Sequence, residues 1–217
     1  MFALPIAVNQ TYANLVLLVA ILLHNLTYPL SAAGGLWPAL FYLFYASLFV
    51  YGTWALTDTR TARLLALISG LATLIAGLVN SYAPGSIAAV AVFLASIVYH
   101  GVMLVVLAIY TFRAKAILTE ILLSATSLYL VIGSGFAAIL SLIEWLAPGS
   151  FISSSGVTIG WQQMIYFSYV TLTTLGYGDI TPIGFFAQAF VTFEAITGTL
   201  YTVILLSRLV GMHASRS

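Results

Sequence analysis

Long apolar runs separated by short polar breaks dominate the pattern of hydrophobic and polar positions along this chain. A helix that crosses a bilayer needs about 20 mostly apolar residues. Six segments reach or approach that length: residues 15–30, 36–56, 64–79, 87–110, 117–146 and 183–210. The pattern therefore predicts six membrane-spanning helices, of which the first is interrupted by His24 and Asn25.

A seventh apolar segment, residues 161–173, is too short to cross a bilayer. It lies between the fifth and sixth predicted spans. Backbone that enters the membrane without crossing it is tolerated where other protein segments bury it. We therefore predict an all-α integral membrane fold, surrounded by lipid, in which a re-entrant half-helix and a loop connect helices five and six.

The composition agrees with this fold and excludes several classes of function. Of the 217 residues, 62% are hydrophobic and 5% are charged, whereas soluble domains carry about a quarter charged residues. Cysteine is absent, which excludes disulfides and thiol chemistry. The histidines are far apart in sequence, and neither a phosphate-binding glycine loop nor a serine nucleophile pattern occurs. We expect no enzyme activity, no cofactor and no nucleic-acid partner.

The six cations mark one side of the predicted membrane protein. They are Arg60, Arg63, Arg113, Lys115, Arg208 and Arg216. They fall between spans two and three, between spans four and five, and after span six, which are three places on the same side. Because cytoplasmic loops collect Lys and Arg, both termini are expected in the cytoplasm, with the protein in the cell membrane. No cation precedes the first span, so we expect a retained anchor and not a cleaved signal peptide.

Residues 173–179 read Thr-Thr-Leu-Gly-Tyr-Gly-Asp, a string that a packed soluble core would not favour. Gly176 and Gly178 permit φ > 0 at alternate positions, so that successive carbonyls can turn toward one axis. Rings of such carbonyls, contributed by several subunits, replace the water shell of an ion. The string therefore predicts a selectivity filter, with the side chains of Leu175 and Tyr177 directed outward into a supporting wall.

The string and its flanks resemble the tetrameric potassium-channel family. Residues 169–173 are similar to the end of that family's pore helix, residues 180–182 to the exit from its filter, and residues 185–211 to its inner helix. The resemblance implies a potassium-selective channel made of four identical subunits. The K⁺ ligands that it implies are the backbone oxygens of Thr174, Leu175, Gly176 and Tyr177, with Gly178 completing the filter. Leu175 departs from the family, which more often has Val or Ile there, and this departure bears on the stiffness of the filter.

The resemblance also indicates which residues support the filter. Thr173 ends the pore helix, whose C-terminal carbonyls then point toward a central cavity. Tyr166 matches a position where the family has an aromatic residue, and we expect its hydroxyl to donate a hydrogen bond to Asp179 at the outer mouth. Glu194 is costly in a membrane helix. We expect it behind the filter, either accepting hydrogen bonds from pore-helix hydroxyls such as Thr171 or Thr173 or carrying a proton itself.

Four residues of the predicted inner helix are candidates for a cavity and a gate. Gly198 matches the family's hinge glycine, although close helix packing is an equal alternative for so small a residue. Thr199, Thr202 and Leu206 follow at helical spacing on one face. The resemblance implies that this face lines a wet cavity, with Leu206 at a cytoplasmic constriction.

The chain divides into two halves at the cations near residue 113. Residues 1–112 form four predicted helices in the position of the voltage sensor of related six-span channels, and residues 113–217 form the pore domain. The fourth segment, residues 87–110, carries no arginine, so a membrane field does almost no work on it. We expect a small bacterial channel that is not strongly voltage-gated. The front half is expected to be a scaffold, or else a sensor for a stimulus that the sequence does not name.

Two alternative functions stay open from the sequence. Leu175 can loosen the wall behind the carbonyls, which would give a weakly selective monovalent cation channel. The chain can also be a non-conducting membrane subunit that keeps the filter as a structural element. No segment resembling a cytosolic ligand-binding module follows residue 212, so gating by such a module is not expected. His24 and His100 lie within predicted spans, where a neutral, hydrogen-bonded state is expected more often than proton sensing.

Overall fold

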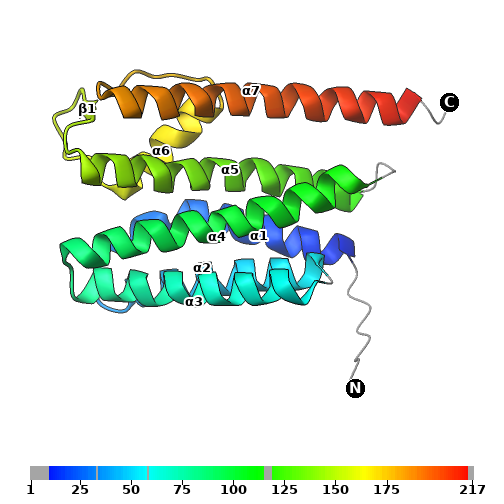
Figure 1. The fold of residues 1–217 in the computed structure, drawn as a ribbon, viewed down its shortest axis with the longest axis horizontal. Helices are drawn as coiled ribbons and strands as arrows, with labels where there is room; N and C mark the ends of the chain where they lie inside the picture. Colours follow the sequence, from blue (N-terminus) through cyan, green and yellow to red (C-terminus); the bar gives the residue numbers. More distant parts are fainter. Residues whose placement is uncertain (1–9, 33, 58, 115–118, 215–217) are drawn as a thin grey trace.

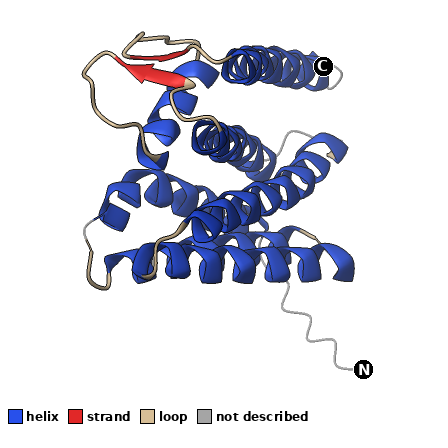
Figure 2. Ribbon diagram, turned by 60° about the vertical axis from the view of Figure 1, so that its left-hand side comes forward, coloured by secondary structure: helices blue, strands red, loops and turns tan. Residues whose placement is uncertain are grey.

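The computed structural model describes residues 10–32, 34–57, 59–114 and 119–214, and this part of the chain is almost entirely helical (Figures 1 and 2). The helices are α1 (Gln10–Thr27), the 3-10 helix η1 (Tyr28–Ala32), α2 (Trp37–Leu56), α3 (Arg60–Tyr82), α4 (Ser86–Arg113), α5 (Thr119–Leu146), α6 (Trp161–Leu172) and α7 (Phe185–Ala214). Two short strands, β1 (Phe151–Ser153) and β2 (Ile180–Pro182), form an antiparallel pair.

Six of the described helices, α1 to α5 and α7, are long and apolar enough to cross a membrane. Their number and order agree with the apolar segments of the sequence. Most run beyond the apolar residues at one end or at both. α3, for example, begins at Arg60 and not at residue 64, and Arg63 in its first turn donates to the carbonyl of Thr57 just after α2 (2.9 Å). Side-chain chemistry therefore supports the start of α3 before its apolar run.

The helices lie side by side in two groups (Figure 1). Helices α1 to α4 form the front half, and α5 lies between this half and α7, with α6 tilted across the space between α5 and α7 (Figures 1 and 2). Both α1 and α4 pack along α5. Fully buried apolar side chains at this junction include Leu17, Tyr99, Met103, Leu107 and Val131. One apolar core thus joins the front half to the outer helix of the back half.

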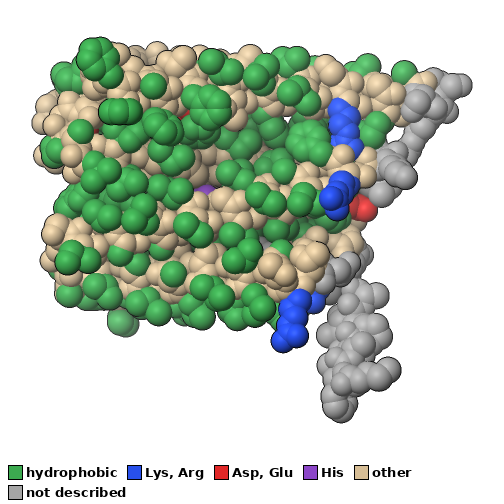
Figure 3. All heavy atoms as spheres, in the orientation of Figure 1, with side chains coloured by type: hydrophobic (Ala, Val, Ile, Leu, Met, Phe, Trp, Pro, Cys, Tyr) green, Lys and Arg blue, Asp and Glu red, His purple; other side chains and the backbone are tan. Residues whose placement is uncertain are grey.

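Basic side chains gather at one end of the molecule, the end opposite the β1–β2 pair (Figures 1 and 3). There, Arg208 near the end of α7 donates to the carbonyls of Thr111 (2.7 Å) and Ala114. These carbonyls end α4, where the negative end of the helix dipole favours a cation. The ends of α7 and α4 are therefore joined directly. Lys115 and Arg216 lie outside the described residues.

The connection that follows α5 is held by side-chain and strand hydrogen bonds. The Glu144 carboxylate accepts the backbone N–H groups of Gly149 (2.8 Å) and Phe151 (3.0 Å). β1 then pairs with β2, placing Ile152 opposite Thr181. The sequence did not predict these strands, because three residues are too few to show an alternating pattern. The pair fastens residues 180–182 to the end of α5.

Helix α7 leaves most of its apolar surface uncovered in a single chain. Its exposed large apolar side chains are Phe185, Phe186, Phe190, Phe193, Ile196, Leu200, Val203, Ile204, Leu206 and Val210. A helix with so much exposed apolar surface requires lipid or another protein surface around it.

Candidate functional site

The short helix expected from residues 161–173 is present as α6, and residues 173–178 follow it directly. The chain turns back beside the end of this helix. The backbone N–H groups of Thr174 and Leu175 donate to the carbonyls of Thr171 (2.9 Å) and Val170 (2.9 Å). These bonds hold the start of the string against the last turn of α6.

The backbone of the string alternates in conformation. Thr174, Gly176 and Gly178 have φ values of 58°, 58° and 75°, whereas Leu175 and Tyr177 do not have positive φ. The sequence indicated the two glycines and missed Thr174, because a Cβ disfavours this left-handed region. A non-glycine residue in a strained conformation is more often found at functional sites. With alternate residues inverted, successive carbonyls can face the same side.

Alternate residues of the string also border different hollows. Thr174, Gly176 and Gly178 line one hollow together with residues of α7. Leu175 and Tyr177 line another, next to α6 and the end of α1. Residues 173–178 are all exposed in the single chain. The outward direction expected for Leu175 and Tyr177 agrees with this arrangement.

The outer end of the string is attached to α6 through Tyr166. Its hydroxyl donates to the Asp179 carboxylate at 2.8 Å, which is the hydrogen bond expected from the sequence. The ring of Tyr166 also stacks on that of Tyr177, with centroids 6.5 Å apart and an interplanar angle of 9°. The Asp179 carbonyl accepts the N–H of Ser154 (2.8 Å). The exit from the string is thus held from two sides.

Glu194 lies on α7 against α6 and is fully buried, but its partner is not one of the two threonines named from the sequence. The Ser168 hydroxyl of α6 contacts Glu194 Oε1, so a hydroxyl of the short helix is the partner, as expected, but the naming of Thr171 or Thr173 was wrong. Thr173 instead donates to the carbonyl of Tyr169 (2.6 Å), one turn back in its own helix. Glu194 Oε2 has no hydrogen-bond partner among the described residues.

Ser168 is the functional candidate that the sequence did not indicate. Besides Glu194, its hydroxyl lies 2.7 Å from the carbonyl oxygen of Gly133 on α5. One side chain therefore bridges α5, α6 and α7. The sequence does contain a signal that could have found it, because Ser168 is a serine among the buried apolar positions of a half-helix. Those positions are Met164, Ile165, Phe167, Val170 and Leu172.

Gly198 lies against the end of α6. A Cβ at this position would overlap the backbone carbonyl oxygen of Leu172. The same carbonyl accepts the Tyr129 hydroxyl of α5 (3.2 Å). The absence of a side chain at Gly198 thus lets α7 approach the C-terminal end of α6, which favours the packing role over a role as a hinge.

The other residues expected in a cavity lie on the exposed surface of α7. The Thr199 and Thr202 hydroxyls donate to carbonyls one turn back in the helix, those of Ala195 (3.0 Å) and Gly198 (3.0 Å). Leu206 is exposed near the basic end of the molecule. In one chain these side chains face no other described element, so the structure leaves their expected roles open.

Comparison with known proteins supports a channel. Residues 116–213 match the family described as "Ion channel". This ion-channel region is a little under half of the chain and contains α5, α6, the string and almost all of α7. It indicates a channel and not an enzyme.

Two similar proteins are potassium channels by name. Over 82 residues, the chain is 42% identical to "Two pore potassium channel c" of Oryza sativa subsp. japonica, covering 38% of this chain and 16% of the relative. Over 79 residues, it is 39% identical to "Inward rectifier potassium channel Kirbac3.1" of Paramagnetospirillum magnetotacticum, covering 35% of this chain and 23% of the relative. The similarity thus spans less than a quarter of either relative. No solved structure matches the chain.

Proposed function

We propose that four copies of this chain form a potassium-selective channel that lets K⁺ move passively across a cell membrane. The observation that carries the proposal is the left-handed conformation of Thr174, Gly176 and Gly178. A backbone of this kind can present a row of carbonyl oxygens that replaces the ion's water shell. The ion-channel region and the names of the two relatives support the choice of ion.

The assembly follows from what one chain leaves uncovered. One copy of the string cannot surround an ion, and both residues 173–178 and many apolar side chains of α7 are exposed in a single chain. Four copies around one axis would close the row into rings and cover part of α7. Native mass spectrometry of the purified protein is expected to show four subunits. A solitary chain under conditions that preserve activity would contradict the proposal.

The orientation in the membrane follows from charge. The basic end of the molecule lies opposite the β1–β2 pair, whose second strand follows the string (Figures 1 and 3). Cytoplasmic ends of membrane proteins collect Lys and Arg. We infer that both termini lie in the cytoplasm and that the filter opens outward. On α7, Thr199 and Thr202 then line the central cavity, and Leu206 lies toward its cytoplasmic constriction.

Potassium flux into liposomes that contain only this chain tests conduction, and reversal potentials in mixed K⁺ and Na⁺ test selectivity. A reversal potential close to that of K⁺ is expected. A potential between those of the two ions would favour the weakly selective alternative, which Leu175 makes reasonable. Absence of flux from tetrameric protein would favour the non-conducting subunit.

We also propose that the channel is weakly sensitive to voltage. Moving one charge across the membrane yields about 2.3 kcal/mol per 100 mV. The only described cation of α4 is Arg113 at its end, and Arg60 and Arg63 lie in the first turn of α3, so the front half has no row of cations within its apolar spans to move through the field. Currents recorded in a planar bilayer should change little in open probability with voltage. A steep activation curve would count against this part of the proposal.

We infer that Glu194 carries a proton behind the filter. The Ser168 hydroxyl has one hydrogen and contacts two acceptors, the Gly133 carbonyl and Glu194 Oε1. A backbone carbonyl can only accept, so both contacts are satisfied together only when Ser168 donates to Gly133. The contact with Glu194 is then satisfied when the acid donates. Glu194 is also fully buried, with no cation beside it among the described residues. Burial of this kind disfavours the charged carboxylate and so also favours the protonated acid.

The Glu194→Gln variant tests this inference, because an amide N–H replaces the acid O–H toward Ser168. We expect potassium flux of the same order as in the unchanged protein. Infrared spectroscopy should show a protonated carboxylic acid band that disappears in this variant. Glu144→Gln is the control, since Glu144 accepts two N–H groups and should contribute only a carboxylate band. An infrared spectrum in which Glu194→Gln removes a carboxylate band would show that Glu194 is charged.

The Tyr166→Phe variant tests the support of the outer mouth. Loss of the hydroxyl removes the hydrogen bond to Asp179 and retains the stacked ring beside Tyr177. We expect current that decays several-fold faster during sustained opening, with unit conductance unchanged. Tyr82→Phe is a control, since its hydroxyl bonds to Gly35 in the front half. Unchanged decay in Tyr166→Phe would remove Tyr166 from the filter support.

A further inference from the structure

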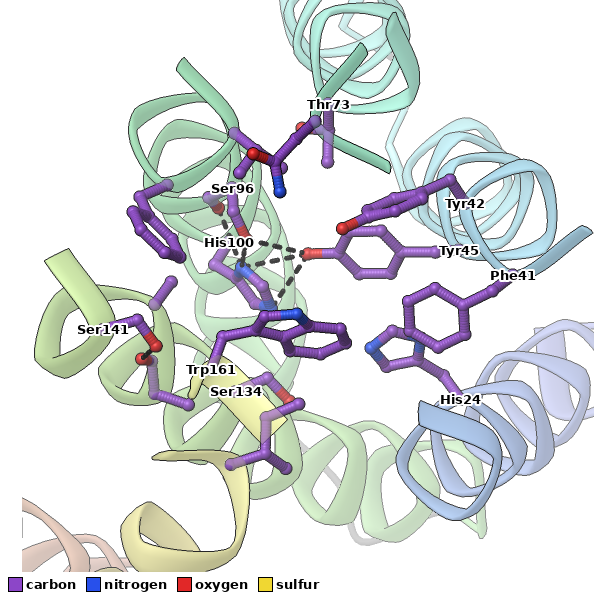
Figure 4. Close-up of a pocket in the computed structure, with 16 residues that line it drawn as sticks. His24, Phe41, Tyr42, Tyr45, Thr73, Ser96, His100, Ser134, Ser141 and Trp161 are labelled. Carbon is purple, nitrogen blue, oxygen red and sulfur yellow. Dashed lines mark hydrogen bonds between the residues drawn. The ribbon is translucent and has the colours of Figure 1, made fainter. Parts of the chain in front are cut away.

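Two adjoining hollows lie between the front half and the back half, and together we call them the crevice. The outer part, of about 760 Å³, lies between the start of α4, the end of α5 and the start of α6. The inner part, of about 60 Å³, reaches His24 and His100 (Figure 4). Asn80, Phe93, Ser141 and Trp161 line both parts. The outer part is large enough for a small organic molecule.

The outer part offers one negative charge. Glu144 lines it, and no Lys or Arg occurs among the described residues that do. Each Glu144 oxygen already accepts one backbone N–H, from Gly149 and Phe151. A carboxylate has about four acceptor positions, so two remain for a positively charged group of a ligand.

The same part also offers two helix N-termini. α4 begins after Gly85 and α6 begins after Gly160, and both glycines border the outer part. At the start of α6 the Gly160 N–H donates to Gln163 Oε1 (2.9 Å), whereas Gly85 before α4 makes no side-chain cap hydrogen bond, so the start of α4 is the more open of the two. The positive end of each helix dipole favours a negative group at this position. The outer part thus has complementary sites for both signs of charge.

The walls of the crevice are aromatic, and its inner end contains an unpartnered polar atom. Phe93 and Trp145 lie with ring centroids 6.5 Å apart, and Trp161 borders both parts. His24 is 5% exposed, and its Nδ1 has no hydrogen-bond partner among the described residues. Figure 4 shows its ring at the cavity wall beside Phe41. A buried polar atom without a partner indicates an occupant that is polar at least in part.

We propose that the crevice binds a small zwitterion with an aromatic or apolar body, that is, a free amino acid. Its ammonium group lies beside Glu144, its carboxylate faces the starts of α4 and α6, and its body packs against the aromatic rings of the wall. Such a ligand contacts the front half at residues such as Phe93 and the back half at Trp161, the first residue of α6. The front half would then act as a sensor for a small molecule, which deepens the proposed channel function. Binding itself does not depend on that function; only an effect of the ligand on conduction rests on it.

Three probes that share one skeleton test the charges separately. Binding of phenylalanine, phenethylamine and 3-phenylpropionate to the purified full chain in detergent is measured by isothermal titration calorimetry. Phenylalanine is expected to bind at least about tenfold more tightly than either compound that lacks one charge. Equal affinities for the three, or no binding of phenylalanine, would overturn the proposal.

Two variants and one matched control locate the site. Glu144→Gln should weaken phenylalanine and phenethylamine about tenfold and leave 3-phenylpropionate unchanged. Ala89 is buried and lines the outer part, so Ala89→Leu should abolish binding of all three probes. Ala91→Leu, on the exposed side of the same helix, should bind like the unchanged chain. Phenylalanine binding that survives Ala89→Leu would place the ligand elsewhere.

The calorimetric test is independent of conduction. It is carried out without a potassium gradient, so a protein that binds phenylalanine and conducts no K⁺ would contradict the channel proposal alone. A protein that conducts K⁺ and binds none of the probes would contradict the ligand proposal alone.

Discussion

Replacing Gly176 with alanine is expected to remove nearly all potassium flux. Gly176 has φ +58°, and no other atom lies within 4 Å of the position of an added Cβ. The cost is therefore one of backbone conformation, about 1–2 kcal/mol for each residue. In four subunits the sum is about 4–8 kcal/mol, which disfavours the conducting arrangement by roughly a thousandfold or more. Flux into liposomes measures the loss.

Gly156→Ala is the matched control for this prediction. Gly156 also has a left-handed φ, +70°, with open space around an added Cβ, but it lies in the turn after β1. The same backbone strain there should leave potassium flux close to that of the unchanged protein. Equal loss of flux in the two variants would mean that strain anywhere in this region, and not the geometry of the filter, limits conduction.

The second large effect is expected from Gly198→Ala. The added Cβ would overlap the Leu172 carbonyl oxygen, and backbone at the end of a helix cannot move aside as a flexible side chain can. α7 and α6 must separate, and overpacking of this kind costs about 1–3 kcal/mol. If four subunits pack around the filter, the cost is repeated in each. We expect a lower melting temperature of the tetramer in detergent and partial dissociation on size-exclusion chromatography.

Gly211→Ala on the same helix provides the comparison. No other atom lies within 4 Å of a Cβ at Gly211, and its φ is not left-handed. Alanine in place of glycine within a helix is favourable by about 1 kcal/mol, so this variant should be as stable as the unchanged protein or more stable. If Gly198→Ala were equally stable and only slowed opening, Gly198 would be a hinge and not a packing site.

Much of the fold could be predicted from the sequence, because membrane-spanning helices depend on a simple property. An apolar run of sufficient length suffices, and the six runs correspond in order to the long helices α1 to α5 and α7. α6 was also predictable, because its run is too short to cross a bilayer. The glycines of the string were informative for a similar reason, since Gly176 and Gly178 permit a backbone that few other residues adopt.

The remaining features depend on contacts between segments distant in sequence. Thr174 takes a left-handed φ although its own preference opposes it. Glu194 pairs with Ser168 and not with the threonines of α6, because the helix rotation that sets this contact is fixed by packing against α5 and α7. The outer part of the crevice is built from four helices, and no local pattern indicates it. Contacts between segments far apart in the sequence leave no hydrophobic or polar pattern from which they could be predicted.

The bond between Arg208 and the end of α4 bears on how the pore can move. Leu206, the expected constriction, lies half a turn of helix before this arginine. A swing of the cytoplasmic end of α7 must therefore either break the hydrogen bonds to Thr111 and Ala114 or pull α4 along with it. The front half, without a row of charges in α4 to sense a field, would then act as a mechanical load on the gate, and its stiffness would set how readily the gate opens.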